Sequence, residues 1–210
     1  MAGAWAAIES LLSNPDDPKG EGERSGKAVA GDRMAAIIAC SWPRAELTAL
    51  AHRHKPRTPD DLAQAIAACT TNQERARLVA EALRTHGATA LDFTGASTKY
   101  SDRPAAQRMA DLVQKPRPVL GDVAGVFRIA LRRLYRTRNI ILHGGATQGV
   151  ALEASLRTAA PLVGAGLDRI IHSDYTEGLD PLDLAARADV ALTLINGETG
   201  LSVVDLLERP

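Results

Sequence analysis

One short stretch of the sequence combines residue types that could act together on a phosphate group. Residues 135–145 read Tyr-Arg-Thr-Arg-Asn-Ile-Ile-Leu-His-Gly-Gly. The guanidinium of Arg138 is planar and permanently charged, which suits it to bind phosphate oxygens. The imidazole of His143 changes its charge near neutral pH, so it could both accept and donate a proton. Arg138 and His143 are therefore candidate catalytic residues, and Asn139 lies about one helical turn before the histidine.

We expect residues from about Leu120 to Leu142 to form the amphipathic helix that positions these side chains. Apolar residues recur at steps of four, three, four and seven, at Val123, Phe127, Ala130, Leu134 and Ile141. Arg138 falls on the same stripe, where a guanidinium must be paired, face a polar cavity or lie at a subunit interface. The adjacent face is basic and carries Arg132, Arg136, Asn139 and His143.

Two opposing effects act on His143 at the end of this helix. The negative end of the helix dipole favours the imidazolium by roughly 0.3 to 1 kcal/mol. The neighbouring arginines disfavour it, so the sequence does not settle the charge state of His143 near neutral pH. We expect Gly144 and Gly145 to terminate the helix through a positive φ and to leave room for a substrate.

The distribution of charge points to an anionic partner. The chain has 25 basic and 25 acidic residues and therefore no net charge, which excludes a generally basic surface. Five arginines and no acidic residue nevertheless lie between Val123 and Leu152. A local basic strip on a neutral protein indicates contact with a focused anionic ligand such as RNA, although most charge runs are solvated helix faces.

The sequence indicates neither a cofactor nor a membrane span. Cys40 and Cys69 lie in apolar runs, which is typical of buried thiols. His52 and His54 could be combined with these cysteines into a zinc site, but their irregular spacing favours surface histidines. The chain has no apolar run near 18 residues and no signal-peptide pattern at its first residues. We therefore expect a cytoplasmic protein without metal or cofactor.

The composition predicts an all-α fold, an antiparallel bundle of about seven to nine helices. Aromatic residues make up 3 % of the chain, and alanine and leucine, which favour helices, dominate the apolar set. We expect Trp42-Pro43 to break an early helix and Pro161 to kink or split a later one, since an interior proline costs about 3 kcal/mol.

The motif in its setting resembles the HEPN superfamily. Its ribonuclease members carry an arginine followed, after four to six residues, by a histidine, often with asparagine after the arginine and glycine after the histidine. Residues 138–144, Arg-Asn-Ile-Ile-Leu-His-Gly, match this form, and residues 6–12 and 30–35 are similar to early helices of abortive-infection members. The resemblance implies a HEPN-like helical domain over residues 1–175, with the motif at 138–143 and a C-terminal helical appendage over residues 176–210 packed on the same domain.

The resemblance also implies a function. Such proteins dimerise so that two motifs face one cleft, and they cut single-stranded RNA without a metal. His143 would transfer protons around the attacking 2′-hydroxyl and the leaving 5′-oxygen, Arg138 would neutralise the pentavalent phosphate, and Asn139 would orient His143 or hold a phosphate oxygen. A dimer fits the geometry, because residues five apart point about 140° away from each other around one helix. The setting would be a toxin or effector of an antiviral or toxin-antitoxin system, controlled by a regulatory partner or antitoxin.

Other residues of the bundle would support this site. Arg132, Arg133 and Arg136 are candidate RNA-binding residues. Glu9 is a candidate supporting residue because the resemblance places an acid early in the bundle, and Tyr135 because it lies near Arg138. The alternative hypothesis is a non-catalytic interaction or RNA-binding module, in which His143 caps the helix and Arg138 forms a structural ion pair, for example with Glu9.

Overall fold

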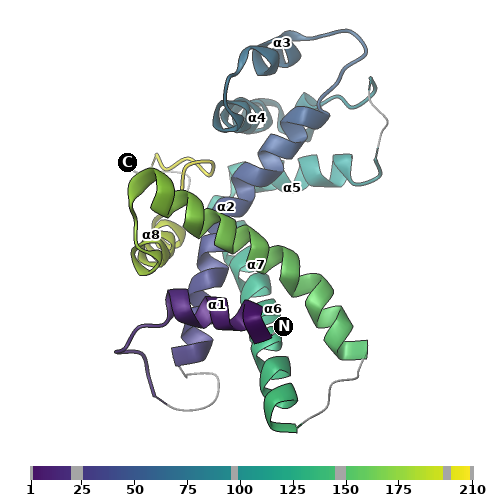
Figure 1. The fold of residues 1–210 in the computed structure, drawn as a ribbon. Helices are drawn as coiled ribbons and strands as arrows, with labels where there is room; N and C mark the ends of the chain where they lie inside the picture. Colours follow the sequence, from purple (N-terminus) through teal and green to yellow (C-terminus); the bar gives the residue numbers. More distant parts are fainter. Residues whose placement is uncertain (1, 20–25, 96–98, 145–149, 196–199, 209–210) are drawn as a thin grey trace. The chain divides into compact units, whose positions relative to one another are not determined.

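The computed structural model describes the chain except residues 1, 20–25, 96–98, 145–149, 196–199 and 209–210, and it does not describe the side chains of Ala2 and residues 141–156. The described residues form eight α-helices and one short 3₁₀ helix, and they contain no strand (Figure 1). The all-α prediction is therefore confirmed. The elements are α1 (Ala2–Leu12), α2 (Gly26–Arg53), α3 (Asp61–Ala68), α4 (Asn72–His86), η1 (Gly87–Ala90), α5 (Asp102–Gln114), α6 (Pro116–Gly144), α7 (Val150–Glu177) and α8 (Pro181–Leu194).

The chain divides into two compact units. Unit 1 consists of Met1–Cys40 and Gly121–Thr193, and unit 2 consists of Ser41–Leu120 and Leu194–Pro210. The division falls inside α2 and inside α6, so each of these helices contributes residues to both units. All candidate catalytic and RNA-binding residues belong to unit 1. The predicted division at residue 175 lies within α7, and it stays a prediction.

Unit 1 has a core of large apolar side chains, and glycines at its helix contacts let the helices approach closely. Side chains with no exposed surface form its core, among them Trp5, Ile8, Leu12, Met34, Ile37, Leu131 and Leu134. A side chain at Gly166 of α7 would collide with Met34 of α2, and a Cβ at Gly31 would lie 3.0 Å from the Trp5 ring. These glycines therefore fix how close α7 and α1 come to α2.

Unit 2 is a smaller set of helices with well-defined ends. Asp60 caps α3 by accepting a hydrogen bond from the Ala63 amide. Thr71 and Glu74 form a capping box at the start of α4. Gly87 ends α4 with a φ of 65°, a conformation that other residues rarely adopt. The core of this unit contains Leu47, Leu83, Met109 and Leu112.

The predicted break at Trp42-Pro43 is wrong, and Pro161 does not split its helix; a kink at Pro161 stays a prediction. Helix α2 continues through Pro43, and α7 continues through Pro161. Pro43 removes one backbone hydrogen bond, but Ile37 and Ile38 before it and Leu47 after it are buried, and their packing outweighs the lost bond. The boundary between the units nevertheless lies next to this proline, between Cys40 and Ser41.

Candidate active site on helix α6

The buried face of α6 differs by one position from the predicted stripe. Leu134 is buried as predicted, but Val123, Phe127 and Ala130 are only half-buried, and the side chain of Ile141 lies outside the described residues. The residues that α6 buries in unit 1 are Ala124, Leu131, Leu134 and Tyr135. Arg138 follows Leu131 and Leu134 at helical spacing, so it lies at the edge of the buried face.

Arg138 forms an ion pair with an acid of α1. Its Nη2 atom lies 3.8 Å from Oε2 of Glu9, and each of the two side chains is 20 % exposed. Its Nη1 atom donates a hydrogen bond of 3.0 Å to Oδ1 of Asn139. The guanidinium is thus held on two sides and still reaches solvent. This ion pair between Arg138 and Glu9 is the one that the non-catalytic alternative predicts.

Glu9 has a second cationic neighbour that the sequence did not reveal. Nζ of Lys27 lies 3.6 Å from Oε1 of Glu9, and this ammonium side chain is 52 % exposed. Oε1 itself is buried and accepts no hydrogen bond from any described residue. Two cations therefore share one carboxylate, which leaves the cluster of Arg138, Lys27 and Glu9 with a formal charge of +1.

Tyr135 helps to place this ion pair. Its ring packs against Trp5 with the ring centroids 5.0 Å apart, and Tyr135 is only 8 % exposed. Trp5 and Glu9 lie one turn apart on α1, as do Tyr135 and Arg138 on α6. The aromatic contact and the ion pair therefore join the same faces of the same two helices. The supporting role of Tyr135 stays a prediction.

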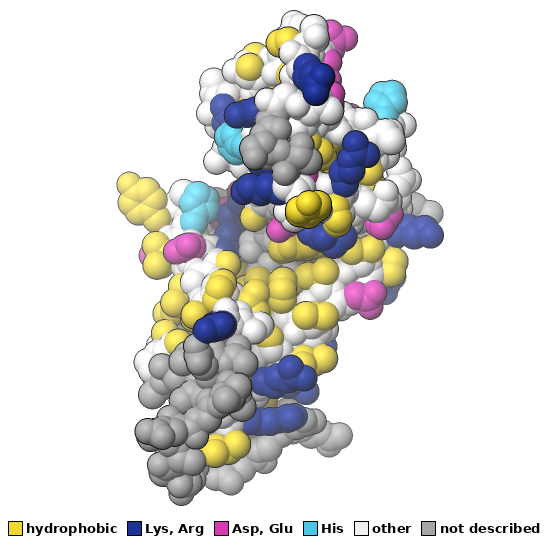
Figure 2. Space-filling model, turned by 90° about the vertical axis from the view of Figure 1, so that its right-hand side faces the viewer, with side chains coloured by type: hydrophobic (Ala, Val, Ile, Leu, Met, Phe, Trp, Pro, Cys, Tyr) yellow, Lys and Arg dark blue, Asp and Glu magenta, His cyan; other side chains and the backbone are white. Residues whose placement is uncertain are grey.

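The predicted RNA-binding arginines divide into two groups. Arg132 donates two hydrogen bonds to Asp32 of α2, at 3.1 and 2.8 Å, and Arg128 lies 3.6 Å from the same carboxylate. Arg132 is therefore committed to a contact between helices. Arg133 and Arg136, in contrast, are exposed. On the face drawn in Figure 2, acidic side chains lie among the basic ones, in keeping with the zero net charge.

The exposed row of α6 also contains apolar residues that the sequence analysis did not single out. Val126, Ile129 and Ile140 are 63, 56 and 62 % exposed. They lie with Arg133 and Arg136 at alternating steps of three and four residues, which places all five side chains on one face. Their spacing is visible in the sequence, but the stripe through Leu134 is equally periodic, so periodicity alone does not distinguish the exposed row from the buried face.

His143 lies in the last described turn of α6, which ends at Gly144. Its side chain lies outside the described residues, as does Gly145, so the expected roles of the imidazole and of this glycine stay predictions. The described part of the site therefore consists of Arg138, Asn139, Glu9, Lys27 and Tyr135. It places the half-buried side chain of Arg138 within one and a half turns of the histidine.

Cys40 and Cys69 belong to no candidate metal site among the described residues. Cys40 is buried as predicted, and its thiol donates to the carbonyl of Ala188. Burial raises the pKa of this thiol to about 12, which keeps it protonated and unreactive. Cys69 is half-buried. Within the described residues no group of three histidine, cysteine or acidic side chains could hold a metal ion.

The prediction that His54 lies at the surface is wrong. This residue is 5 % exposed, and its Nε2 lies 3.0 Å from Oδ1 of Asp60. Its Nδ1 accepts a hydrogen bond of 3.1 Å from the amide of Asp92, which identifies the neutral tautomer with its proton on Nε2. His54 is buried because it joins two loops of unit 2. His52, two residues earlier, is exposed as predicted.

Comparisons of the chain with family models, curated proteins and solved structures gave no match. Among the described residues, no helix combines the length and the apolar character that crossing a membrane requires.

Proposed function

We propose that this chain is a metal-independent endoribonuclease that cuts single-stranded RNA by attack of the 2′-hydroxyl on the adjacent phosphate. The observation that carries the proposal is the placement of Arg138. Its side chain is half-buried and tied to Asn139, on the helix whose last turn contains His143. Phosphate transesterification needs a group that transfers protons, which the histidine could supply, and groups that stabilise developing negative charge, which the arginine and the amide could supply.

Each residue has a separate task in this reaction. His143 accepts the proton of the 2′-hydroxyl or donates one to the leaving 5′-oxygen. Arg138 binds the phosphate oxygens, where negative charge develops in the transition state. Asn139 holds one side of the Arg138 fork, and Glu9 holds the other. The products are a 2′,3′-cyclic phosphate and a free 5′-hydroxyl.

We propose that a second copy of the chain completes the site. Residues five apart point about 140° away from each other on one helix, so a single regular α6 aims Arg138 and His143 poorly at one phosphate, and either a second copy or local unwinding at the glycines would complete the site. The exposed row of Val126, Ile129 and Ile140 gives α6 an apolar face for such a copy. Arg133 and Arg136 on the same row contribute positive charge toward the RNA. The biological setting would be a toxin or effector of antiviral or toxin-antitoxin defence, restrained by a partner protein.

One observation favours the alternative, a helical interaction or RNA-binding module without catalysis. Both Arg138 and Arg132 form ion pairs between helices, with Glu9 and Asp32 respectively. In the module these pairs are structural only, and the exposed arginines make contact with RNA or with a larger complex. The two functions differ in whether the chain cuts RNA.

Incubation of the purified chain with end-labelled single-stranded RNA in EDTA tests the proposal. We expect cleavage by the native chain and loss of cleavage in His143→Ala and in Arg138→Ala. His172→Ala is the matched control, because His172 is an exposed histidine on another helix, and it should cleave normally. Cleavage that requires an added divalent metal, or that is kept in the His143 variant, would overturn the mechanism. Absence of cleavage at all RNA and protein concentrations would favour the module.

A further inference from the structure

The C-terminal segment Gly200–Glu208, which we call the tail, packs in unit 2 without forming a helix. Four of its side chains are 2–4 % exposed, and they are the two apolar pairs Val203, Val204, Leu206 and Leu207. Asp205 lies between the two pairs, and Glu208 follows the second pair. The tail therefore has the pattern of two apolar residues, an acid, two apolar residues and an acid.

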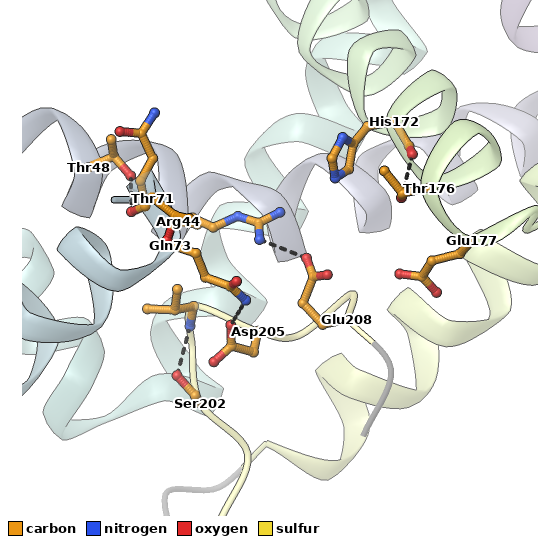
Figure 3. Close-up of polar contacts among 12 residues, drawn as sticks. Arg44, Thr48, Thr71, Gln73, His172, Thr176, Glu177, Ser202, Asp205 and Glu208 are labelled. Carbon is orange, nitrogen blue, oxygen red and sulfur yellow. Dashed lines mark hydrogen bonds and ion pairs between the residues drawn. The ribbon is translucent and has the colours of Figure 1, made fainter. Parts of the chain in front are cut away.

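The two acids of the tail bind cationic and amide groups elsewhere in unit 2 (Figure 3). Asp205 accepts hydrogen bonds from Nε2 of Gln73 at 2.6 Å and from Nε of Arg77 at 2.9 Å. Glu208 accepts a hydrogen bond of 2.7 Å from Nη1 of Arg44. The bond to Asp205 raises the pKa of Arg77. These partners come from α2 and α4, more than 120 positions earlier in the chain.

The shape of the tail is set by its own backbone. The amide of Val204 donates to Oγ of Ser202, the amide of Asp205 donates to the Ser202 carbonyl, and the amide of Glu208 donates to the Asp205 carbonyl. Gly200 enters the tail with a φ of 75°. Two consecutive turns therefore form inside the tail, with its four apolar side chains buried and its two acids bound to Gln73, Arg77 and Arg44. This is how a short peptide motif meets its receptor, with its conformation preset and its contacts made by side chains.

The receptor face extends beyond the tail. A hollow of about 390 Å³ lies beside Gly200–Val203, and Arg77, Glu81, Arg84 and Val113 are among the residues that line it. The tail does not fill this hollow. Apolar and charged side chains, including the ion-paired Arg84 and Glu81, thus continue along the surface on which the tail lies.

We infer that this face of unit 2 is a peptide-docking site for a protein segment with two apolar pairs and two spaced acids, a site that the tail occupies within its own chain. Charge complementarity identifies the partner, because Arg77, Gln73 and Arg44 bind the two carboxylates that such a segment presents. A partner protein that carries the same pattern would displace the tail and take its place. The inference is independent of RNA cleavage and concerns unit 2 only.

The tethered tail competes strongly with any free segment. Because it belongs to the same chain as the site, the tail competes at an effective concentration on the order of 1 mM. A free peptide that binds the empty site with a Kd of about 10 μM would therefore show an apparent Kd of about 1 mM on the native chain. A substitution that weakens the binding of the tail to the site should make the site accessible to a free peptide.

The test uses fluorescence anisotropy with a labelled nine-residue peptide of the sequence of residues 200–208. The receptors are the full-length native chain and full-length chains with Asp205→Arg, Arg77→Glu or, as a control at an exposed arginine outside the site, Arg103→Glu. We expect the Asp205→Arg chain to bind the peptide at least tenfold more tightly than the native chain and the control. A peptide that carries the Asp205→Arg change should bind the Asp205→Arg chain at least fivefold more weakly than the native peptide does. The Arg77→Glu chain should reverse the preference and select the Asp205→Arg peptide.

Three results would overturn the inference. The first is no saturable binding of either peptide to any chain at 1 mM. The second is equal binding of the two peptides to the Asp205→Arg chain. The third is loss of helical circular dichroism in the Asp205→Arg chain, because the tail would then be an obligatory part of the core rather than a docked segment. Loss of RNA cleavage in these chains has no bearing on the inference, since binding is read directly.

Discussion

Replacement of Glu9 by glutamine tests how Arg138 is held. The substitution keeps the shape of the side chain and removes its negative charge. It abolishes the attraction to Arg138 at 3.8 Å and to Lys27 at 3.6 Å. The aromatic contact between Trp5 and Tyr135 stays intact, so α1 remains packed on α6. The change therefore isolates the ionic part of the contact between these two helices.

The size of the effect follows from the distance and the exposure. Two unit charges about 4 Å apart attract each other by about 4 kcal/mol at an effective dielectric constant of 20. Desolvation and side-chain ordering cancel most of this, and partly exposed pairs retain about 1 kcal/mol. Lys27 adds little because its side chain is 52 % exposed. We expect Glu9→Gln to lower the free energy of unfolding by about 1 kcal/mol, which corresponds to about 2–4 °C in Tm for a chain of this size.

Urea unfolding followed by circular dichroism measures this loss, and a double-mutant cycle assigns it. Glu9→Gln, Arg138→Gln and the double variant should show a coupling energy of about 1 kcal/mol. If Glu9 orients Arg138 for catalysis, Glu9→Gln should also reduce kcat for RNA by about tenfold. A coupling energy near zero would refute the reasoning, because Arg138 would then be held by something other than Glu9.

Three further predictions concern the fold. Leu131→Ala, at a side chain with no exposed surface, should lower the free energy of unfolding by about 2–5 kcal/mol. Val126→Ala on the exposed row should change it by less than about 0.5 kcal/mol. Thermal unfolding compares the two variants, and equal losses would contradict the assigned faces of α6. Thr71→Ala removes the capping box of α4 and should cost about 1 kcal/mol in urea unfolding, and an unchanged midpoint would contradict it. The hydrogen bond from Arg53 lowers the pKa of Asp102, so the stabilisation from this pair is present above the ordinary carboxyl pKa of about 3.9 and is lost as the pH falls. Asp102→Asn should therefore flatten the fall in stability below about pH 5. An unaltered pH profile of unfolding would contradict this prediction.

The helical class and the position of the candidate site could be read from the sequence because they depend on local pattern. Alanine-rich segments with apolar residues at helical spacing gave the fold class. The position of Arg138 on a predominantly apolar stripe required a partner, and Glu9 provides one. The local rule failed at Pro43, where α2 continues, and it did not split α7 at Pro161; buried neighbours outweigh the local cost of a proline at both positions.

Other features could not be predicted because they depend on contacts between distant residues. Lys27 approaches Glu9, and Asp32 engages Arg132 100 positions later, but neither pair has a local signature. His54 looked like a surface residue because its partner loops, at Asp60 and Asp92, meet only in the folded unit. The two-unit division likewise cuts through two continuous helices, where no linker composition marks it.

Analysis of the RNA ends tests the central claim most directly. An oligoribonucleotide is incubated with the chain in EDTA, and the products are identified by mass spectrometry beside a matched oligonucleotide with one 2′-deoxy residue at the cleaved position. We predict a 2′,3′-cyclic phosphate and a 5′-hydroxyl from the first substrate and no cut at that position in the second. Products with a 3′-hydroxyl and a 5′-phosphate, or cleavage of the deoxy-substituted position, would contradict the assignment of Arg138 and His143 to a 2′-hydroxyl attack.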